Sequence, residues 1–178
     1  MEVVYPMENL NRQLLTNGFK FNDDLKIGTK KTLPEKIVQF GEGNFLRAFV
    51  DYMFDEINEQ GLFEGGITLI QPIPGGDFLR NVLNEQEGLY TLIARGREDG
   101  KEVAAKRLIT CVNRCINPYV DLDTYNTCAK NPELRFVVSN TTEAGISWKE
   151  EDMVTDQPQD SFPAKVCNFL YVRFKEFN

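Results

Sequence analysis

The stretch IVQFGEGNFLRAFVDYMFDEIN, residues 37–58, decides the fold. Its first residues end a compact apolar run, residues 35–40, which follows Pro34 and is typical of a buried parallel strand. The two-glycine turn Gly41-Glu42-Gly43 comes directly after this run, and a helix is predicted from Phe45 to Gln60. A strand, a glycine turn and a helix in direct succession predict an α/β fold.

The predicted helix has a regular apolar pattern and a clear end. Gly61 closes it, and residues 67–71 form a second apolar run that predicts another buried strand. Proline and glycine residues at 72–76 cannot continue that strand, because proline lacks the ladder donor. The apolar residues of the helix recur at three- and four-residue steps, which places them on one face: Phe45, Phe49, Tyr52, Met53, Phe54 and Ile57.

The rest of the chain continues this alternation with one interruption. Residues 89–94 and 106–112 are predicted strands joined through a turn-rich segment around Asp99-Gly100, which suggests an antiparallel insertion in a mostly parallel sheet. Residues 135–139, RFVVS, predict a further buried strand. Three more helices are predicted: one from Asp77 to about Asn84, one at residues 121–130, and one at residues 161–177 with Ser161 as its cap and an apolar stripe at Val166, Phe169, Leu170, Phe174 and Phe177.

Composition narrows the range of functions. The 178 residues suffice for one well-cored domain, which we place at residues 35–178. A leader at residues 1–34 precedes it, in which residues 10–19 predict a short helix ended by Gly18. A net charge of −7 without a Lys/Arg cluster argues against nucleic acid and anionic membranes as partners. The sequence lacks an export signal and any apolar stretch of about 18 residues, which predicts a cytoplasmic protein.

Cysteine and histidine usage restrict the chemistry further. The four cysteines lack C-x-x-C pairing and are expected to be buried reduced thiols. The sequence has no histidine, which excludes Ser-His-Asp arrangements, H-E-x-x-H zinc sites and histidine general bases from these residues. No metal site is expected.

The glycine turn is the main candidate binding site. Glycine permits a tight turn and close approach of a dinucleotide pyrophosphate, and the free amides at a helix start attract that anion. Gly41 and Gly43 hold these roles, with Asn44 and Phe45 completing the turn, while Leu46 replaces the third glycine of the usual fingerprint. From spacing alone, an ordinary glycine turn in another α/β protein is an equally good interpretation.

Other candidate cofactor contacts surround this turn. Arg47, in the first turn of the predicted helix, offers a bidentate phosphate contact. The alternative interpretation is an ordinary surface arginine. The second strand ends in Gln71 and not in the acid that usually binds the adenosine ribose, so Gln71 and Asp77 are the candidates there, with helix capping an alternative role for Asp77. Asn140 and Thr141 follow the strand at 135–139 and are placed to contact a nicotinamide or ribose, or to form an Asn/Thr turn.

Four stretches together give a more specific signal than the glycines. They are residues 37–58, GGDFLRNVLNEQEGLYTLIARG at 75–96, RFVVSNTTEAGI at 135–146 and SFPAKVCNFLYVRF at 161–174. In this order the chain resembles the mannitol dehydrogenase family of long-chain polyol and sugar-acid dehydrogenases, most closely its sugar-acid branch. The resemblance implies a modified Rossmann fold, and places Gly41, Gly43, Phe45 and Arg47 on the nucleotide-binding motif and Asn140 and Thr141 on the nicotinamide-side loop.

The same resemblance implies the activity. Members of that branch are NAD-dependent, metal-independent oxidoreductases that reduce tagaturonate to altronate in hexuronate catabolism. The family's catalytic lysine, with an asparagine and a histidine, lies in a second, helical domain, which we expect beyond Asn178. The present chain is therefore expected to bind NAD and not to turn over substrate, and the sugar acid is expected to be held through that other domain.

Three alternatives stay open at this point. The chain is also consistent with a dehydrogenase of another polyol or polyol phosphate, because the absent domain decides the substrate. A non-catalytic nucleotide-binding module uses the same fold without chemistry. A methyltransferase also holds its cofactor over a glycine turn, although the segment SNTTEAGI at 139–146 argues against it.

Overall fold

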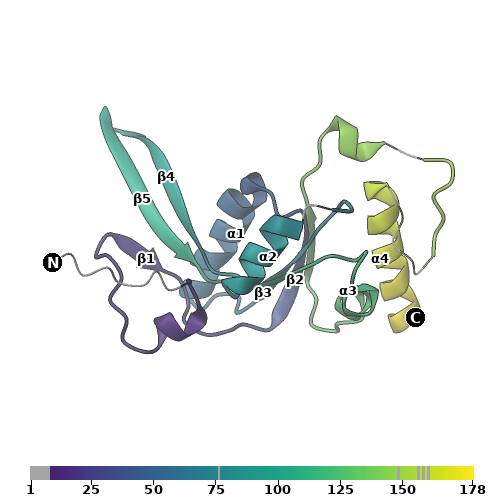
Figure 1. The fold of residues 1–178 in the computed structure, drawn as a ribbon, viewed down its shortest axis with the longest axis horizontal. Helices are drawn as coiled ribbons and strands as arrows, with labels where there is room; N and C mark the ends of the chain where they lie inside the picture. Colours follow the sequence, from purple (N-terminus) through teal and green to yellow (C-terminus); the bar gives the residue numbers. More distant parts are fainter. Residues whose placement is uncertain (1–8, 76, 148, 156, 158, 160) are drawn as a thin grey trace.

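The computed structural model describes residues 9–75, 77–147, 149–155, 157, 159 and 161–178. Its centre is a four-stranded parallel sheet in the order β6-β3-β2-β7 (Figure 1). The first and second predicted strands are confirmed to within a residue. The strands are β2 (Glu35–Phe40), β3 (Gly66–Ile70), β6 (Val112–Ile116) and β7 (Phe136–Ser139).

Helices cover both faces of this sheet, as expected when a sheet is parallel. α1 (Asn44–Glu59) and α2 (Asp77–Glu85) pack on the face that carries Ile37, Ile67 and Leu69. α3 (Leu122–Ala129) and α4 (Phe162–Phe177) pack on the opposite face, against Val38, Phe40 and Ile70. The alternation of neighbouring residues between two apolar cores explains why these strands appear in the sequence as continuous apolar runs. The α/β prediction is confirmed.

A second, three-stranded sheet is the predicted antiparallel insertion. β4 (Tyr90–Glu98) and β5 (Lys101–Ile109) form a hairpin that projects from the body of the protein (Figure 1). Asp99 and Gly100 have positive φ angles of 50° and 77°, so two residues suffice for the turn. Both strands therefore extend further towards the turn than predicted.

The apolar run at residues 106–112 belongs to two strands, which the sequence did not predict. β5 ends at Ile109 in the second sheet, and β6 starts at Val112 in the parallel sheet. Between them, the amides of Thr110 and Cys111 donate to the carboxylate of Asp55 on α1. This side chain takes the place of a strand partner and lets the chain change sheets.

The described part of the predicted leader packs onto the second sheet. A short 3₁₀ helix, Arg12–Leu15, lies within residues 10–19, where a short helix ended by Gly18 was predicted. The strand β1 (Leu25–Ile27), which was not predicted, pairs with β5 in parallel. Leu15 packs against the buried Leu89 and Leu108. Residues 1–8 of the leader lie outside the described part, and the division of the chain at residue 34 stays a prediction.

Side chains cap two of the predicted helices, and the cap by Ser161 was itself predicted. The side chain of Asp121 accepts from the amide of Thr124 at the start of α3, and that of Ser161 accepts from Ala164 at the start of α4. In α4, Phe169 is buried, but Leu170, Phe174 and Phe177 are exposed, so only part of the apolar stripe faces the core.

Two burial predictions are wrong. β7 was predicted to be buried, but most of its residues are exposed because it lies at the end of the strand order and pairs with β2 alone among the described residues. Cys167 is exposed, whereas Cys111, Cys115 and Cys128 are buried free thiols. Burial raises the pKa of Cys115 to about 12 and that of Cys128 to about 11, so both stay protonated at neutral pH.

The described residues lack two features that would change the expected function. None of their helices combines the length and apolar character needed to cross a membrane. They also contain no group of three or more Cys, Asp or Glu side chains arranged to hold a metal ion.

Candidate cofactor site

Three predicted binding segments meet at one edge of the parallel sheet. Phe40, the last residue of β2, pairs with Ile70 on β3 and with Ser139 on β7. The residues that follow these three strands, Gly41, Gln71 and Asn140, therefore leave the sheet side by side. Strand order reverses at β2, since β3 and β6 lie on one side of it and β7 on the other. Ligands of open α/β sheets bind at this kind of switch point.

The two glycines of the turn differ in what they require. Gly41 has a φ of +115°, a backbone conformation that residues other than glycine rarely adopt, so the backbone itself requires glycine here. Gly43 has an ordinary φ of −68°, is exposed, and would accept a Cβ without meeting any atom within 4 Å. Steric contacts therefore do not require glycine at 43, and glycine leaves the space beside the first amides of α1 open.

The turn leads straight into α1, which begins at Asn44 with Gly43 as its N-cap. The first amides of a helix have no partner within the helix, and the helix dipole adds a positive potential at this end. Beneath the turn, the buried side chain of Gln39 donates to the carbonyl of Gly41 at 3.1 Å. The first amides of α1 are thus available to a ligand, and the hydrogen bond from Gln39 supports the turn from the protein interior.

Arg47 is fixed beside the turn. Its Nε donates to the carbonyl of Glu42 at 2.9 Å and its Nη2 donates to Oδ1 of Asn44 at 2.5 Å. The guanidinium therefore stays close to the start of α1, which keeps a positive charge near the exposed amides. This arrangement suits a phosphate group.

The side chain of Gln71 is buried, whereas that of Asp77 is partly open to solvent. Gln71 is buried, and its Nε2 donates to the carbonyls of Ile73 and Gly75, so it holds the loop after β3. Asp77 is the first residue of α2, and its Oδ1 accepts from Nδ2 of Asn117 at 3.1 Å and pairs with Arg80 at 3.3 Å. The side chain of Asp77 is 47% exposed, so it keeps a surface open to a ligand.

Asn140 and Thr141 are exposed at the end of β7. The hydroxyl of Thr141 donates to the carbonyl of Thr142 at 3.4 Å, and a 3₁₀ helix, Glu143–Ile146, follows. The segment is thus a polar turn next to the glycine turn, and its contact with a nicotinamide or ribose stays a prediction.

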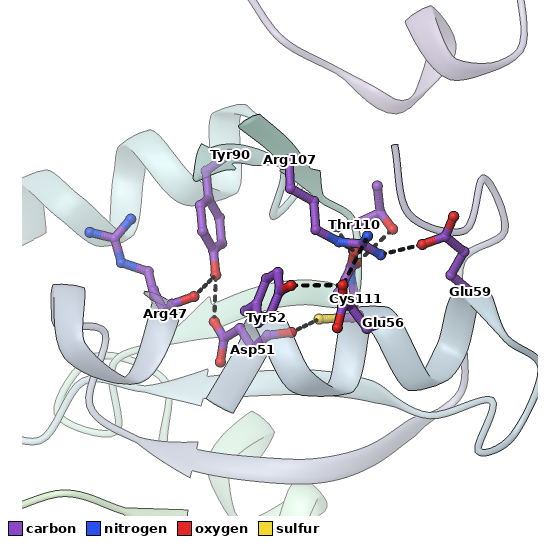
Figure 2. Close-up of polar contacts among 10 residues, drawn as sticks. Arg47, Asp51, Tyr52, Glu56, Glu59, Tyr90, Arg107, Thr110 and Cys111 are labelled. Atoms are coloured by element: carbon purple, nitrogen blue, oxygen red, sulfur yellow. Dashed lines mark hydrogen bonds and ion pairs between the residues drawn. The ribbon is translucent and has the colours of Figure 1, made fainter. Parts of the chain in front are cut away.

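Behind the turn, α1 directs a polar face towards the second sheet (Figure 2). Asp51 is fully buried, and the hydroxyl of Tyr90 lies 2.9 Å from both its Oδ2 and the carbonyl of Arg47. Burial raises the pKa of Asp51 to about 7, although hydrogen bonds from Tyr90 and Gln39 oppose the shift. The sequence did not identify Asp51 or Tyr90 as part of the site.

One turn further along α1, Asp55 joins the helix to both sheets. Its Oδ1 accepts from the amide and hydroxyl of Thr110 and from the amide of Cys111, and its Oδ2 accepts from Nε of Arg107 at 2.6 Å (Figure 2). Arg107 also donates to Glu59 at 2.8 Å. Every one of these groups except Glu59 is buried, so the network fixes the second sheet against α1.

The apolar stripe of α1 lies on its outer side. Phe45, Phe49, Met53 and Ile57 are each at least 36% exposed, while Asp51 and Asp55 are fully buried. The predicted helix is correct, but of its predicted apolar stripe only Tyr52 and Phe54 pack against the core.

Comparisons with known proteins give the family of the chain. Residues 35–178 match the family model described as the mannitol dehydrogenase Rossmann domain. The chain belongs to the mannitol dehydrogenase family. The resemblance predicted from the sequence is therefore confirmed.

Relatives within the mannitol dehydrogenase family include altronate oxidoreductases. The protein from Yersinia enterocolitica is 51% identical over 146 residues, and that from Bacillus subtilis is 45% identical over 144 residues. These alignments cover 82% and 81% of this chain but 30% of each relative. The chain thus spans about 30% of the length of these mannitol dehydrogenase family members.

Solved structures confirm the predicted Rossmann-type fold. Mannitol 2-dehydrogenase of Pseudomonas fluorescens, solved as a ternary complex with NAD and D-mannitol, matches with a TM-score of 0.73 at 21% identity. The match covers 93% of this chain and 36% of that one. A substrate-free D-sorbitol dehydrogenase gives a TM-score of 0.66 at 20% identity, covering 80% of this chain and 29% of that one.

Asp51 gives this mannitol dehydrogenase family domain a testable pH dependence. A folded pKa of about 7 lies above the ordinary 3.8, so between these values the folded state binds more protons than the unfolded state. The free energy of unfolding should therefore fall as pH rises from about 4 to 7, by up to about 4 kcal/mol from this group. Asp51→Asn has no proton to lose and should remove this slope.

Urea unfolding of both proteins at pH 5.5 and pH 8 measures the effect. We expect the stability of Asp51→Asn relative to the original protein to increase between these two pH values. Equal relative stability at both would contradict the raised pKa.

Proposed function

We propose that this chain is the NAD(H)-binding domain of an oxidoreductase that interconverts tagaturonate and altronate by hydride transfer. The observation that carries the proposal is the row formed by Gly41, Gln71 and Asn140 at the switch point of the sheet, with an exposed, sterically open Gly43 at the start of α1. A mannitol 2-dehydrogenase of the same fold was solved with NAD and D-mannitol bound.

The residues of this edge fit a dinucleotide. Gly43, Asn44 and Phe45 would hold the pyrophosphate at the amides of α1, with Arg47 as the neighbouring cation. Asp77 would bind the adenosine ribose through its exposed side, and Gln71 would shape the loop beneath it. Asn140 and Thr141 would contact the nicotinamide side. Bound NADH supplies the hydride that reduces a ketone substrate.

The substrate proposal depends on relatives and not on a contact in this chain. Altronate oxidoreductases at 45–51% identity support a sugar acid. Since the chain spans 30% of their length, we propose that the sugar acid and the proton donor are held by a region outside the aligned part. A cytoplasmic location and the exclusion of nucleic acid stay predictions.

Direct titration tests the cofactor proposal. We expect NADH added to this chain to bind saturably, seen as enhanced nicotinamide fluorescence and as a higher unfolding temperature. S-adenosylmethionine at the same concentration should change neither. No binding of NADH, or preferential binding of S-adenosylmethionine, would overturn the proposal.

The substrate requires a separate assay. A protein that combines this domain with the catalytic region of a relative should oxidise NADH with tagaturonate faster than with fructose or fructose phosphates. A preference for a neutral ketose would instead support a polyol dehydrogenase, and a preference for its phosphate a polyol-phosphate dehydrogenase. Cofactor binding without turnover of any of these would favour a nucleotide-binding module.

A further inference from the structure

Tyr90 connects the second sheet to the glycine turn. It is the first residue of β4, and 9% of its surface is exposed. Its ring lies beneath the guanidinium of Arg47, 5.2 Å from ring centre to Cζ, in a cation–π geometry. Figure 2 shows the ring beside the side chain of Arg47, with its hydroxyl pointing towards Asp51 and the carbonyl of Arg47.

Arg47 is thereby held from three directions. Glu42 and Asn44 accept hydrogen bonds from its Nε and Nη2, and Tyr90 covers one face of its guanidinium. A free arginine side chain loses considerable rotamer freedom when it binds an anion. Here that freedom is already restricted before any ligand arrives.

The ring of Tyr90 is itself fixed. Its hydroxyl lies 2.9 Å from the carbonyl of Arg47 and 2.9 Å from Oδ2 of Asp51, and its side chain packs in the core formed with Ile37, Ile67 and Leu69. Asp51 and Arg47 both lie on α1, so the contacts of Tyr90 fix its ring relative to the helix that carries the guanidinium. A fixed ring can orient a flexible cation, whereas an exposed one cannot.

We propose that Tyr90 is a positioning residue for the cofactor phosphates, acting through Arg47, whose guanidinium its ring holds at the start of α1. This inference rests on the proposed function, because it assumes that the phosphates lie at the glycine turn. It assigns a role in cofactor binding to the antiparallel insertion, which otherwise lies outside the row of strand ends.

A double-mutant cycle read by NADH titration tests the proposal. Tyr90→Leu is expected to raise the Kd for NADH about tenfold. Tyr90→Phe, which restores the ring without the hydroxyl, should recover most of that loss. In an Arg47→Gln background, Tyr90→Leu should have little further effect, because the cation that the ring positions is absent.

Tyr52→Leu is a matched control. Tyr52 also lies near an arginine, with Cζ of Arg107 5.9 Å from its ring centre, but it lies further along α1 from the turn. It undergoes the same chemical change and should leave the Kd for NADH unaltered. An equal loss in Tyr52→Leu and Tyr90→Leu would show that the effect is general destabilisation, and would overturn the proposal.

A measurement on the unaltered chain covers the case in which Tyr90→Leu does not fold. The side-chain protons of Arg47, assigned with Arg47→Lys, should show an upfield ring-current shift in proton NMR spectra. Their absence from the shifted region would overturn the proposal.

Failure of this inference can be told apart from failure of the proposed function. If the unaltered chain does not bind NADH, the proposed function fails. If it binds NADH and Arg47→Gln weakens binding, but folded Tyr90→Leu does not, only the positioning role fails.

Discussion

Replacing Gly43 with valine is expected to abolish NADH binding and to leave the protein folded. Gly43 has an ordinary φ of −68°, and a Cβ built on it meets nothing within 4 Å, so the backbone tolerates a side chain. A branched side chain would occupy the space in which the pyrophosphate approaches the amides of α1. Loss of two charge-assisted hydrogen bonds corresponds to a Kd raised by at least about a hundredfold.

NADH fluorescence titration and thermal unfolding of the same variant provide the measurement. Gly96→Val is the matched control, because Gly96 also has open space around its Cβ but lies in the hairpin formed by β4 and β5. It should bind NADH normally. NADH titrations of Gly43→Val that superimpose on those of the unaltered chain would remove the glycine turn from the cofactor site.

Replacing Asp55 with alanine is expected to lower the free energy of unfolding by about 3–5 kcal/mol. Asp55 is fully buried and accepts hydrogen bonds from Arg107, Thr110 and Cys111. Its removal leaves the guanidinium of Arg107 buried without its closest counter-charge and leaves two backbone amides without an acceptor. Both consequences are costly in a buried environment.

Urea unfolding compares this variant with Glu59→Ala. Glu59 binds the same guanidinium, at 2.8 Å, but its side chain is 48% exposed, so its loss should cost less than about 1 kcal/mol. A similar small loss in both variants would mean that the carboxylate of Asp55 does not hold the second sheet to α1.

The sequence predicted α1 well but not the side that it buries. Its start and end are correct to within one residue, because the glycine turn and Gly61 define them. Four residues of the apolar stripe, Phe45, Phe49, Met53 and Ile57, are exposed, while the buried positions include Asp51 and Asp55. Carboxylates can face inward here only because Tyr90, Arg107 and Thr110 supply donors, and these residues lie far away in the sequence.

The bounds of a strand could also be predicted from the sequence, but its sheet and its burial could not. β2 was predicted with its observed bounds, since proline and glycine flank it. The single run at residues 106–112 hides a change of sheet that depends on Asp55, and no local pattern reports that contact. β7 has the composition of a buried strand, but burial depends on its place at the end of the strand order.

The candidate site was predicted in part. The glycine turn and the segment at Asn140 do leave neighbouring strands at one edge, as their positions after apolar runs indicated. Tyr90 and Asp51 were missed, because residues 89–94 indicated only a strand and no local pattern marked Asp51 as a buried residue. Their relation to Arg47 is a property of the packing between α1 and the second sheet.

Strand order also has a consequence for how the chain folds. β2 lies at the centre of the parallel sheet, yet its partner β7 pairs Phe136 with Ile37 across about 100 residues of sequence. Forming that pair closes a long loop, which costs entropy before any contact compensates for it. We therefore expect the cofactor edge, which needs β2, β3 and β7 in register, to be completed late in folding, after the β4–β5 hairpin has formed locally.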